Sequence, residues 1–116
     1  MKAFILLFWV VWTLGAVAQE EKIHWLTMTE ADKLYQENPK PMVIDFYTDW
    51  CGWCKHMDKT TYTNPAVITF INKYFYPVKI NAEGRDTLYF RNKMYAPVKN
   101  GTKMLSSLAI EMLKGK

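Results

Sequence analysis

The clearest pattern of apolar and polar positions lies in the middle of the chain. Residues 43–47 are apolar, β-branched or aromatic except for one acid, Asp45, and this composition predicts a buried strand. Polar residues end the strand at 48–49, and a helical pattern that contains Cys51 and Cys54 follows. This order places Cys51 at the N-terminus of the helix and Cys54 about one turn later on the same face. The two sulfur atoms are therefore predicted to lie within disulfide reach of each other.

A helix is predicted to precede this strand. Either Thr27 or Thr29 can cap its N-terminus, and the helical pattern continues through Glu37. Leu34 and Tyr35 are expected to face inward from this helix.

Several further elements are predicted after the cysteine pair. The helix that begins at Cys51 is expected to run to Tyr62. The remaining elements, in chain order, are a helix capped by Asn64 with Pro65 in its first turn, a strand over 76–80, a hairpin over 86–95 that turns at 91–93, a turn at 100–101 and a last helix capped by Thr102. A strand, a helix and a second strand at this spacing predict a parallel βαβ unit, so the expected fold class is α/β.

The N-terminus differs in character from the rest of the chain. Lys2 is followed by an apolar run that extends to Gly15, and residues 16–18 form an Ala-x-Ala cleavage motif. This pattern predicts a secretory signal peptide over 1–18 and a single domain over 19–116. The alternative is a transmembrane anchor, although the apolar run is shorter than the roughly 20 residues that span a bilayer.

Composition and charge narrow the function further. A hydrophobic share of 50% is sufficient for a core and is not that of a disordered chain. The formal net charge is +4, and the charged residues are interspersed without a basic stripe, so no nucleic-acid partner is expected. In an exported protein, a lone pair of cysteines can also be a plain structural disulfide. That alternative stays open, although a bridge across two residues closes a small loop and restrains the unfolded chain little.

The segment around the cysteines resembles the active site of thioredoxin-like oxidoreductases. Asp45 matches the buried acid of that family, and the run from Trp50 to Lys55, Trp-Cys-Gly-Trp-Cys-Lys, matches its active-site motif, with Trp53 where thioredoxin itself has proline. This variant is similar to a secreted bacterial branch of the family, so the resemblance implies a periplasmic location. A helix N-terminus favours a thiolate, and the pKa of a cysteine in such a motif is lowered to roughly 3.5–7.5 from about 8.5.

The resemblance implies a role for each residue of this site. Cys51 would be the nucleophile that attacks a substrate disulfide, and Cys54 would resolve the mixed disulfide. Asp45, whose pKa burial would raise, would exchange a proton with Cys54; the alternative is a strand-end residue that hydrogen-bonds the backbone. The residues expected to contact a substrate chain are those beside the cysteines, Trp50, Gly52 and Trp53. The alternative for the two tryptophans is packing in the core.

The resemblance covers residues 23–80 well and residues 81–116 loosely. The family fold continues with a strand preceded by a cis-proline, a further strand and a helix. Pro97 is near the expected spacing, but residues 98–101 predict a turn where that strand would begin. The expected fold is therefore a thioredoxin-like βαβ core that lacks the C-terminal strands and helix, a truncated form of the α/β fold.

The predicted function is that of an exported, monomeric thiol–disulfide oxidoreductase that acts on protein thiols and disulfides. Its redox centre would be the Cys51–Cys54 pair with no other cofactor, and the resemblance implies a membrane-bound reductant as a partner. A metal site that adds His56 to the two cysteines is not expected, because structural zinc takes four protein ligands and His24 is the only other histidine. Two alternatives stay open: a non-catalytic exported binding domain with a structural disulfide, and an inactive truncated fragment.

Overall fold

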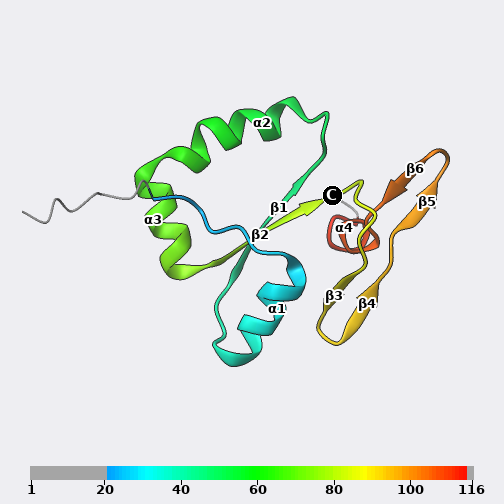
Figure 1. Cartoon of the computed structure of the whole chain (residues 1–116), viewed down its shortest axis with the longest axis horizontal. Coiled ribbons are helices and arrows are strands. Elements are labelled where there is room, and N and C mark those ends of the chain that lie inside the picture. Colours follow the sequence, from blue (N-terminus) through cyan, green and yellow to red (C-terminus); the bar gives the residue numbers. More distant parts are fainter. Residues whose placement is uncertain (1–20, 115–116) are drawn as a thin grey trace, which may run out of the picture.

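A computed structural model describes residues 21–114 of the chain (Figure 1). The elements, in chain order, are α1 (Met28–Glu37), β1 (Met42–Tyr47), α2 (Gly52–Lys59), the 3-10 turn η1 (Thr61–Thr63), α3 (Pro65–Tyr74), β2 (Tyr76–Asn81), β3 (Leu88–Phe90), β4 (Lys93–Tyr95), β5 (Val98–Asn100), β6 (Lys103–Leu105) and α4 (Ser107–Met112). The predicted signal peptide lies outside the described residues. Within the described part of the chain, no helix has the length and apolar character needed to cross a bilayer.

The centre of the fold is a parallel pair of strands joined by helices. β1 pairs with β2, and their register places Met42 opposite Tyr76 and Asp45 opposite Lys79. Leu26 forms an isolated parallel bridge to Val78 on the other side of β2. α2 and α3 make the connection between the two strands (Figure 1). This arrangement confirms the predicted βαβ unit and the α/β fold class.

Alternate residues of β2 point to opposite faces of this pair, and each face has its own core. One face carries Val78 at the centre of a core formed with α1 and α4, whose fully buried side chains are Met28, Val78 and Leu108. The other face lies toward α2 and α3 and carries Lys79. Ile23 packs there against two isoleucines of α3, Ile68 and Ile71. The strands thus separate an apolar layer from a layer that contains charge.

The helix caps follow the sequence closely. Thr27 is the N-cap of α1 and forms a capping box with Glu30, so the choice between the two predicted threonines falls on Thr27. Asn64 caps α3 as predicted, and its side chain accepts hydrogen bonds from the first backbone N–H groups of that helix. The expectation that Leu34 and Tyr35 face inward is wrong, because both are exposed on α1.

The predicted helix from Cys51 to Tyr62 is interrupted. The α-helical part ends at Lys59, and Thr60 leads into the short 3-10 turn. The hydroxyl groups of Thr60 and Thr63 donate to backbone carbonyl groups of the preceding turn. Such hydroxyl bonds compete with the regular helical pattern, which explains why a run rich in threonine ends the helix early.

The C-terminal part consists of two small hairpins and a helix. β3 and β4 form the predicted hairpin, with Arg91 and Asn92 in the left-handed conformation at its turn. β5 and β6 form a second hairpin around Gly101, so the expectation of only a turn after Pro97 is wrong. The last helix is capped by Ser106 and not by Thr102, because residues 103–105 form a strand in place of the first helical turn.

Within residues 21–114, no strand pairs with the second edge of β1. Every residue of β1 is only partly buried, in contrast to β2, where most are buried. All peptide bonds of the described residues are trans, including the one before Pro97. The structure is thus consistent with the expected shortened form of a thioredoxin-like core.

Candidate active site at the cysteine pair

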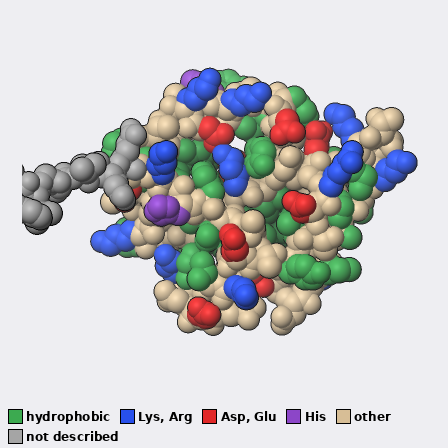
Figure 2. All heavy atoms as spheres, in the orientation of Figure 1, with side chains coloured by type: hydrophobic (Ala, Val, Ile, Leu, Met, Phe, Trp, Pro, Cys, Tyr) green, Lys and Arg blue, Asp and Glu red, His purple; other side chains and the backbone are tan. Residues whose placement is uncertain are grey.

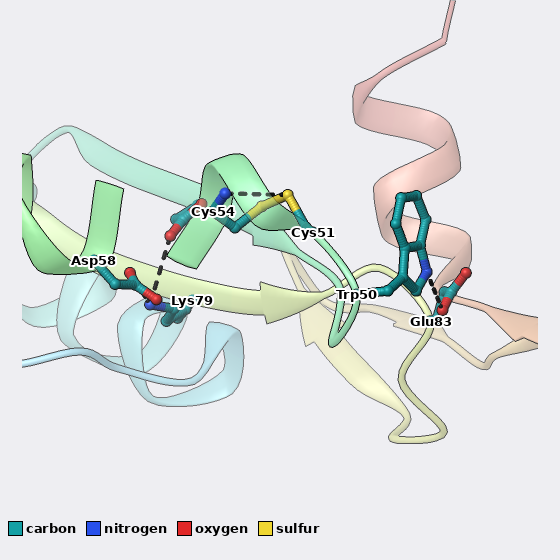
Figure 3. Close-up of a disulfide and its surroundings, with 7 residues drawn as sticks. Trp50, Cys51, Cys54, Asp58, Lys79 and Glu83 are labelled. Atoms are coloured by element: carbon teal, nitrogen blue, oxygen red, sulfur yellow. Dashed lines mark hydrogen bonds and ion pairs between the residues drawn. A yellow bond between two sulfur atoms is a disulfide. The ribbon is translucent and has the colours of Figure 1, made fainter. Parts of the chain in front are cut away.

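The two cysteines form a disulfide at the N-terminus of α2 (Figure 3). Cys51 is the N-cap of that helix, and its Cα atom lies 5.3 Å from that of Cys54. The backbone N–H of Cys54 donates a hydrogen bond to Sγ of Cys51 at 3.2 Å. A sulfur atom that caps a helix receives N–H groups of the first turn and the positive end of the helix dipole, and both favour a thiolate after reduction. The geometry predicted for the pair is confirmed.

The residues around the cysteines form an exposed apolar surface. Trp50 and Trp53 are 69% and 79% exposed, so neither packs in the core. Gly52 is exposed between them and begins α2, with open space where a Cβ atom would lie. Trp53 contacts His56 in an edge-on arrangement with ring centroids 5.7 Å apart. Exposed aromatic groups of this size are available for contact with another molecule.

Asp45 lies on the charged face of the strands, where burial changes its chemistry. Its side chain is 13% exposed, and its buried Oδ2 atom has no hydrogen-bond partner within the described residues. Burial raises the pKa of Asp45, and the negative charge of Asp58 raises it further, while Lys79 opposes both effects. The carboxyl group therefore holds a proton at a higher pH than an ordinary aspartate.

Lys79 connects the acids of this face. Its Nζ atom lies 2.6 Å from Oδ1 of Asp58 on α2 (Figure 3). The same atom lies 3.7 Å from Oδ2 of Asp45 on β1. The ammonium group also lies 4.8 Å from the ring centroid of Trp25 and 5.5 Å from that of Tyr47. A cation between two carboxylates and two rings is held in a fixed position. The shorter distance shows that Asp58 is its main partner.

Tyr62 extends this group of titratable side chains. Its ring packs edge-on against Trp25 with centroids 5.0 Å apart. Burial raises the pKa of the Tyr62 hydroxyl, and the negative charges of Asp45 and Asp58 add to the effect. Tyr62 therefore keeps its proton at physiological pH.

Asp45 is recognisable as a site residue from the sequence, whereas Lys79 and Asp58 are not among the predicted site residues. Lys79 stands in a short apolar strand, and a parallel register that sets it opposite Asp45 would have indicated the pair. Asp58 follows Cys54 by four residues, a spacing that places both on one face of a helix. The Lys79 signal depends on knowing how the two strands align, whereas the Asp58 signal depends only on helical spacing.

A metal site receives no support from the side chains described. Residues 21–114 contain no group of three or more His, Cys, Asp or Glu side chains that could hold a metal ion. His56 is exposed on α2, and the backbone N–H of His24 donates to Asn72 of α3. Disulfide chemistry of the cysteine pair is consistent with a site that uses no external cofactor.

Curated relatives carry thiol–disulfide names. The chain is 36% identical over 62 residues to the thiol:disulfide interchange protein DsbD of Klebsiella pneumoniae and covers 10% of that protein. It is 30% identical over 63 residues to the protein of the same name in Vibrio vulnificus, again covering 10%. In both cases about half of the present chain is aligned, 48% and 49% respectively. The chain thus spans about a tenth of the length of these relatives.

A protein family matches a longer part of the chain. No solved structure matches it. The Thioredox_DsbH family, whose description reads "Protein of unknown function, DUF255", matches residues 15–109. This range contains the cysteine pair, Asp45 and Lys79 together with both hairpins. Since the match extends over most of the sequence, the chain belongs to the Thioredox_DsbH family.

Proposed function

We propose that the protein is an exported thiol–disulfide oxidoreductase whose substrates are protein thiols and disulfides. The observation that carries the proposal is the Cys51–Cys54 disulfide at the N-terminus of α2. Asp45 of β1, whose pKa is raised by burial, supports it as a group that can exchange a proton. The names of the DsbD relatives support thiol–disulfide exchange as the class of reaction. The apolar N-terminal run supports export, and the periplasm is the proposed compartment.

In the direction of substrate reduction, the reaction begins with the reduced pair. The Cys51 thiolate attacks one sulfur of the substrate disulfide, a Cys51–substrate bond forms, and the other substrate sulfur leaves as a thiolate that takes up a proton. Cys54 then loses its proton and attacks Sγ of Cys51. The Cys51–Cys54 disulfide forms, the second substrate thiol is released, and two electrons have passed to the substrate. The same steps in reverse donate a disulfide.

Asp45 is proposed as the group that accepts the proton of Cys54. A carboxylate whose pKa is raised is a stronger base than an ordinary aspartate, so it exchanges protons with a thiol more readily. Lys79 and Asp58 are proposed to set how strongly Asp45 holds the proton, because both act on its pKa. A proton acceptor matters most for the second step, in which a neutral Cys54 thiol must become a nucleophile.

The exposed residues beside the cysteines are proposed to contact the substrate. Trp50, Gly52 and Trp53 are the neighbours of the two cysteines in the sequence, and the two exposed indole rings offer apolar area to an extended chain. A membrane-bound reductant is proposed as the source of electrons, since exchange in the reducing direction needs the pair to be reduced after each turnover. The protein is proposed to act as a monomer.

A redox titration of the full chain tests this function. The protein would be equilibrated at defined potentials, its thiols blocked by alkylation, and the number of blocked thiols counted by mass spectrometry. A reversible two-electron transition between about −120 and −270 mV would match disulfide-exchange catalysts. A bond that stays closed below about −300 mV would identify a structural disulfide and would favour the non-catalytic binding domain.

A further inference from the structure

Trp50 directly precedes Cys51 and is fixed by contacts at the surface. Its indole is 69% exposed, so core packing does not determine its orientation. The indole N–H donates a hydrogen bond to Oε2 of Glu83 at 3.0 Å (Figure 3). The Nζ atom of Lys103 lies 5.6 Å from the centroid of the Trp50 ring and 3.3 Å from Oε1 of Glu83. Indole, carboxylate and ammonium therefore form a closed group of three contacts.

Backbone hydrogen bonds hold the frame of this group. The N–H of Ala82 donates to the carbonyl of Tyr47 at the end of β1 at 2.8 Å, and the N–H of Ser106 donates to the carbonyl of Ala82 at 2.8 Å. The turn at 81–84 is thus tied on one side to the strand that leads to Cys51. On its other side it is tied to the end of the β5–β6 hairpin (Figure 1).

Lys103 is the member of the group that belongs to the hairpin. Each carboxylate oxygen of Glu83 has its own partner, Oε1 the Lys103 ammonium and Oε2 the Trp50 indole. Removal of the ammonium would free one oxygen of Glu83 and would also remove the cation beside the indole ring. The Trp50 indole would then keep only its hydrogen bond to Glu83. The ring could turn about this bond, because a single hydrogen bond to a partly exposed carboxylate fixes distance better than orientation.

We propose that Lys103 is a positioning residue for the cysteine pair. Through Glu83 it holds the Trp50 indole beside Cys51 in the orientation in which a polypeptide disulfide binds, so the β5–β6 hairpin forms part of the site for protein substrates. This inference rests on the proposed oxidoreductase function. A small disulfide needs access to Sγ of Cys51 but no extended apolar contact, so it would depend little on the indole orientation.

The test compares a protein disulfide with a small one in the full chain. Reduction of insulin and of oxidised glutathione would be measured with dithiothreitol as the electron donor, and kcat and KM would be separated. Lys103→Met is expected to raise the KM for insulin about three- to tenfold, with kcat and the glutathione rate changed less than about twofold. Lys103→Arg keeps the cation and should restore the parental KM.

A matched control lies on the same hairpin. Lys99 on β5 is exposed and forms no ion pair with another described residue, so Lys99→Met removes the same charge without touching the group. Its insulin KM is expected to equal that of the parent. A spectroscopic readout reports the indole directly: the Trp50 indole N–H signal, identified by its loss in Trp50→Phe, should shift in Lys103→Met and stay in place in Lys99→Met.

The outcomes separate this inference from the function on which it rests. If the unmodified chain reduces neither disulfide, the proposed function fails and the role of Lys103 fails with it. If the unmodified chain reduces both, but Lys103→Met keeps the parental insulin KM and indole signal, only the positioning role is overturned. An equal loss on both disulfides would also overturn it, because it would indicate general damage to the cysteine pair.

Discussion

Asp45 and Lys79 are direct partners in the parallel register of β1 and β2, yet their charged atoms are 3.7 Å apart while Asp58 lies 2.6 Å from the same ammonium. Lys79 therefore neutralises Asp58 more completely than Asp45. Asp45 is left with a buried oxygen, Oδ2, that has no hydrogen-bond partner within the described residues. This asymmetry agrees with the raised pKa of Asp45, because burial outweighs the attraction of the lysine.

Replacement of Asp45 by asparagine should stabilise the fold at neutral pH. The pKa of Asp45 is raised above its ordinary value of 3.8, so the folded chain binds this proton more tightly than the unfolded chain. The stability that the protonated carboxyl contributes is fully present when the pH is below the pKa of Asp45 in the unfolded chain. It is lost as the pH rises through the raised pKa of Asp45 in the folded chain. Asparagine resembles the protonated acid. The free energy of unfolding of Asp45→Asn should therefore exceed that of the parent by about 1–3 kcal/mol near neutral pH.

Thermal unfolding across a pH series measures this difference. The gap between Asp45→Asn and the parent should narrow as the pH falls through the raised pKa, because the parent then also carries a neutral side chain. Asp49→Asn is the control, since Asp49 is exposed in the loop before the cysteines. A gap that is the same at every pH would show that the effect does not come from ionisation of Asp45.

Replacement of Lys79 by methionine should weaken the fold. Asp58 would lose a close ion pair, and Asp45 would be left beside a second negative charge on the same face. Leaving a partly buried charge without its partner costs about 1–3 kcal/mol, so the urea midpoint should fall accordingly. Lys33→Met on the exposed side of α1 removes the same charge and should leave the midpoint nearly unchanged.

The two cysteines should respond differently to substitution. Cys51→Ser removes the proposed nucleophile and should abolish exchange, whereas Cys54→Ser should leave the first step intact and accumulate mixed disulfides. Non-reducing mass spectrometry after incubation with insulin would detect those adducts. The catalytic interpretation would be abandoned if both variants kept the parental insulin activity.

The apolar core on the α1 face offers a test of packing. Met28 is fully buried between α1 and the sheet, so Met28→Ala should lower the free energy of unfolding by about 2–5 kcal/mol. Leu34→Ala on the same helix should cost less than about 1 kcal/mol, because Leu34 is 38% exposed. Chemical denaturation followed by circular dichroism compares the two. Similar losses would mean that the helix packs differently from the arrangement described.

Much of the fold follows from local signals in the sequence. The capping residues Thr27 and Asn64 fixed two helix starts, and the run 43–47 with the cysteine motif gave the strand and helix of the site. The wrong start predicted for the last helix has a tertiary cause. Thr102 was expected to start a helix because the apolar residues that follow fit a helical spacing, but pairing between β5 and β6 takes Lys103–Leu105 into a strand. Tertiary pairing overrides local preference there.

The predicted part of the site is the part that depends on residues close together in the sequence. The cysteine pair and its position at the start of α2 depend on a few adjacent residues, so a motif describes them well. The partners of Asp45 and Trp50, namely Lys79 and Glu83, lie on or just after β2, and Lys103 lies on another hairpin. Their approach depends on strand register and on the path of the C-terminal turns, which composition and periodicity do not specify.

The parallel pairing of β1 with β2 also bears on the order in which the protein matures. A parallel connection must close the whole α2–α3 crossover before its strands meet, and such distant contacts form slowly compared with a helical turn. The disulfide, in contrast, lies within residues 51–54 and needs no distant partner. The two cysteines can therefore come within bonding reach of each other before Lys79 arrives beside Asp45, and the proton chemistry of the finished site is acquired only when β2 docks.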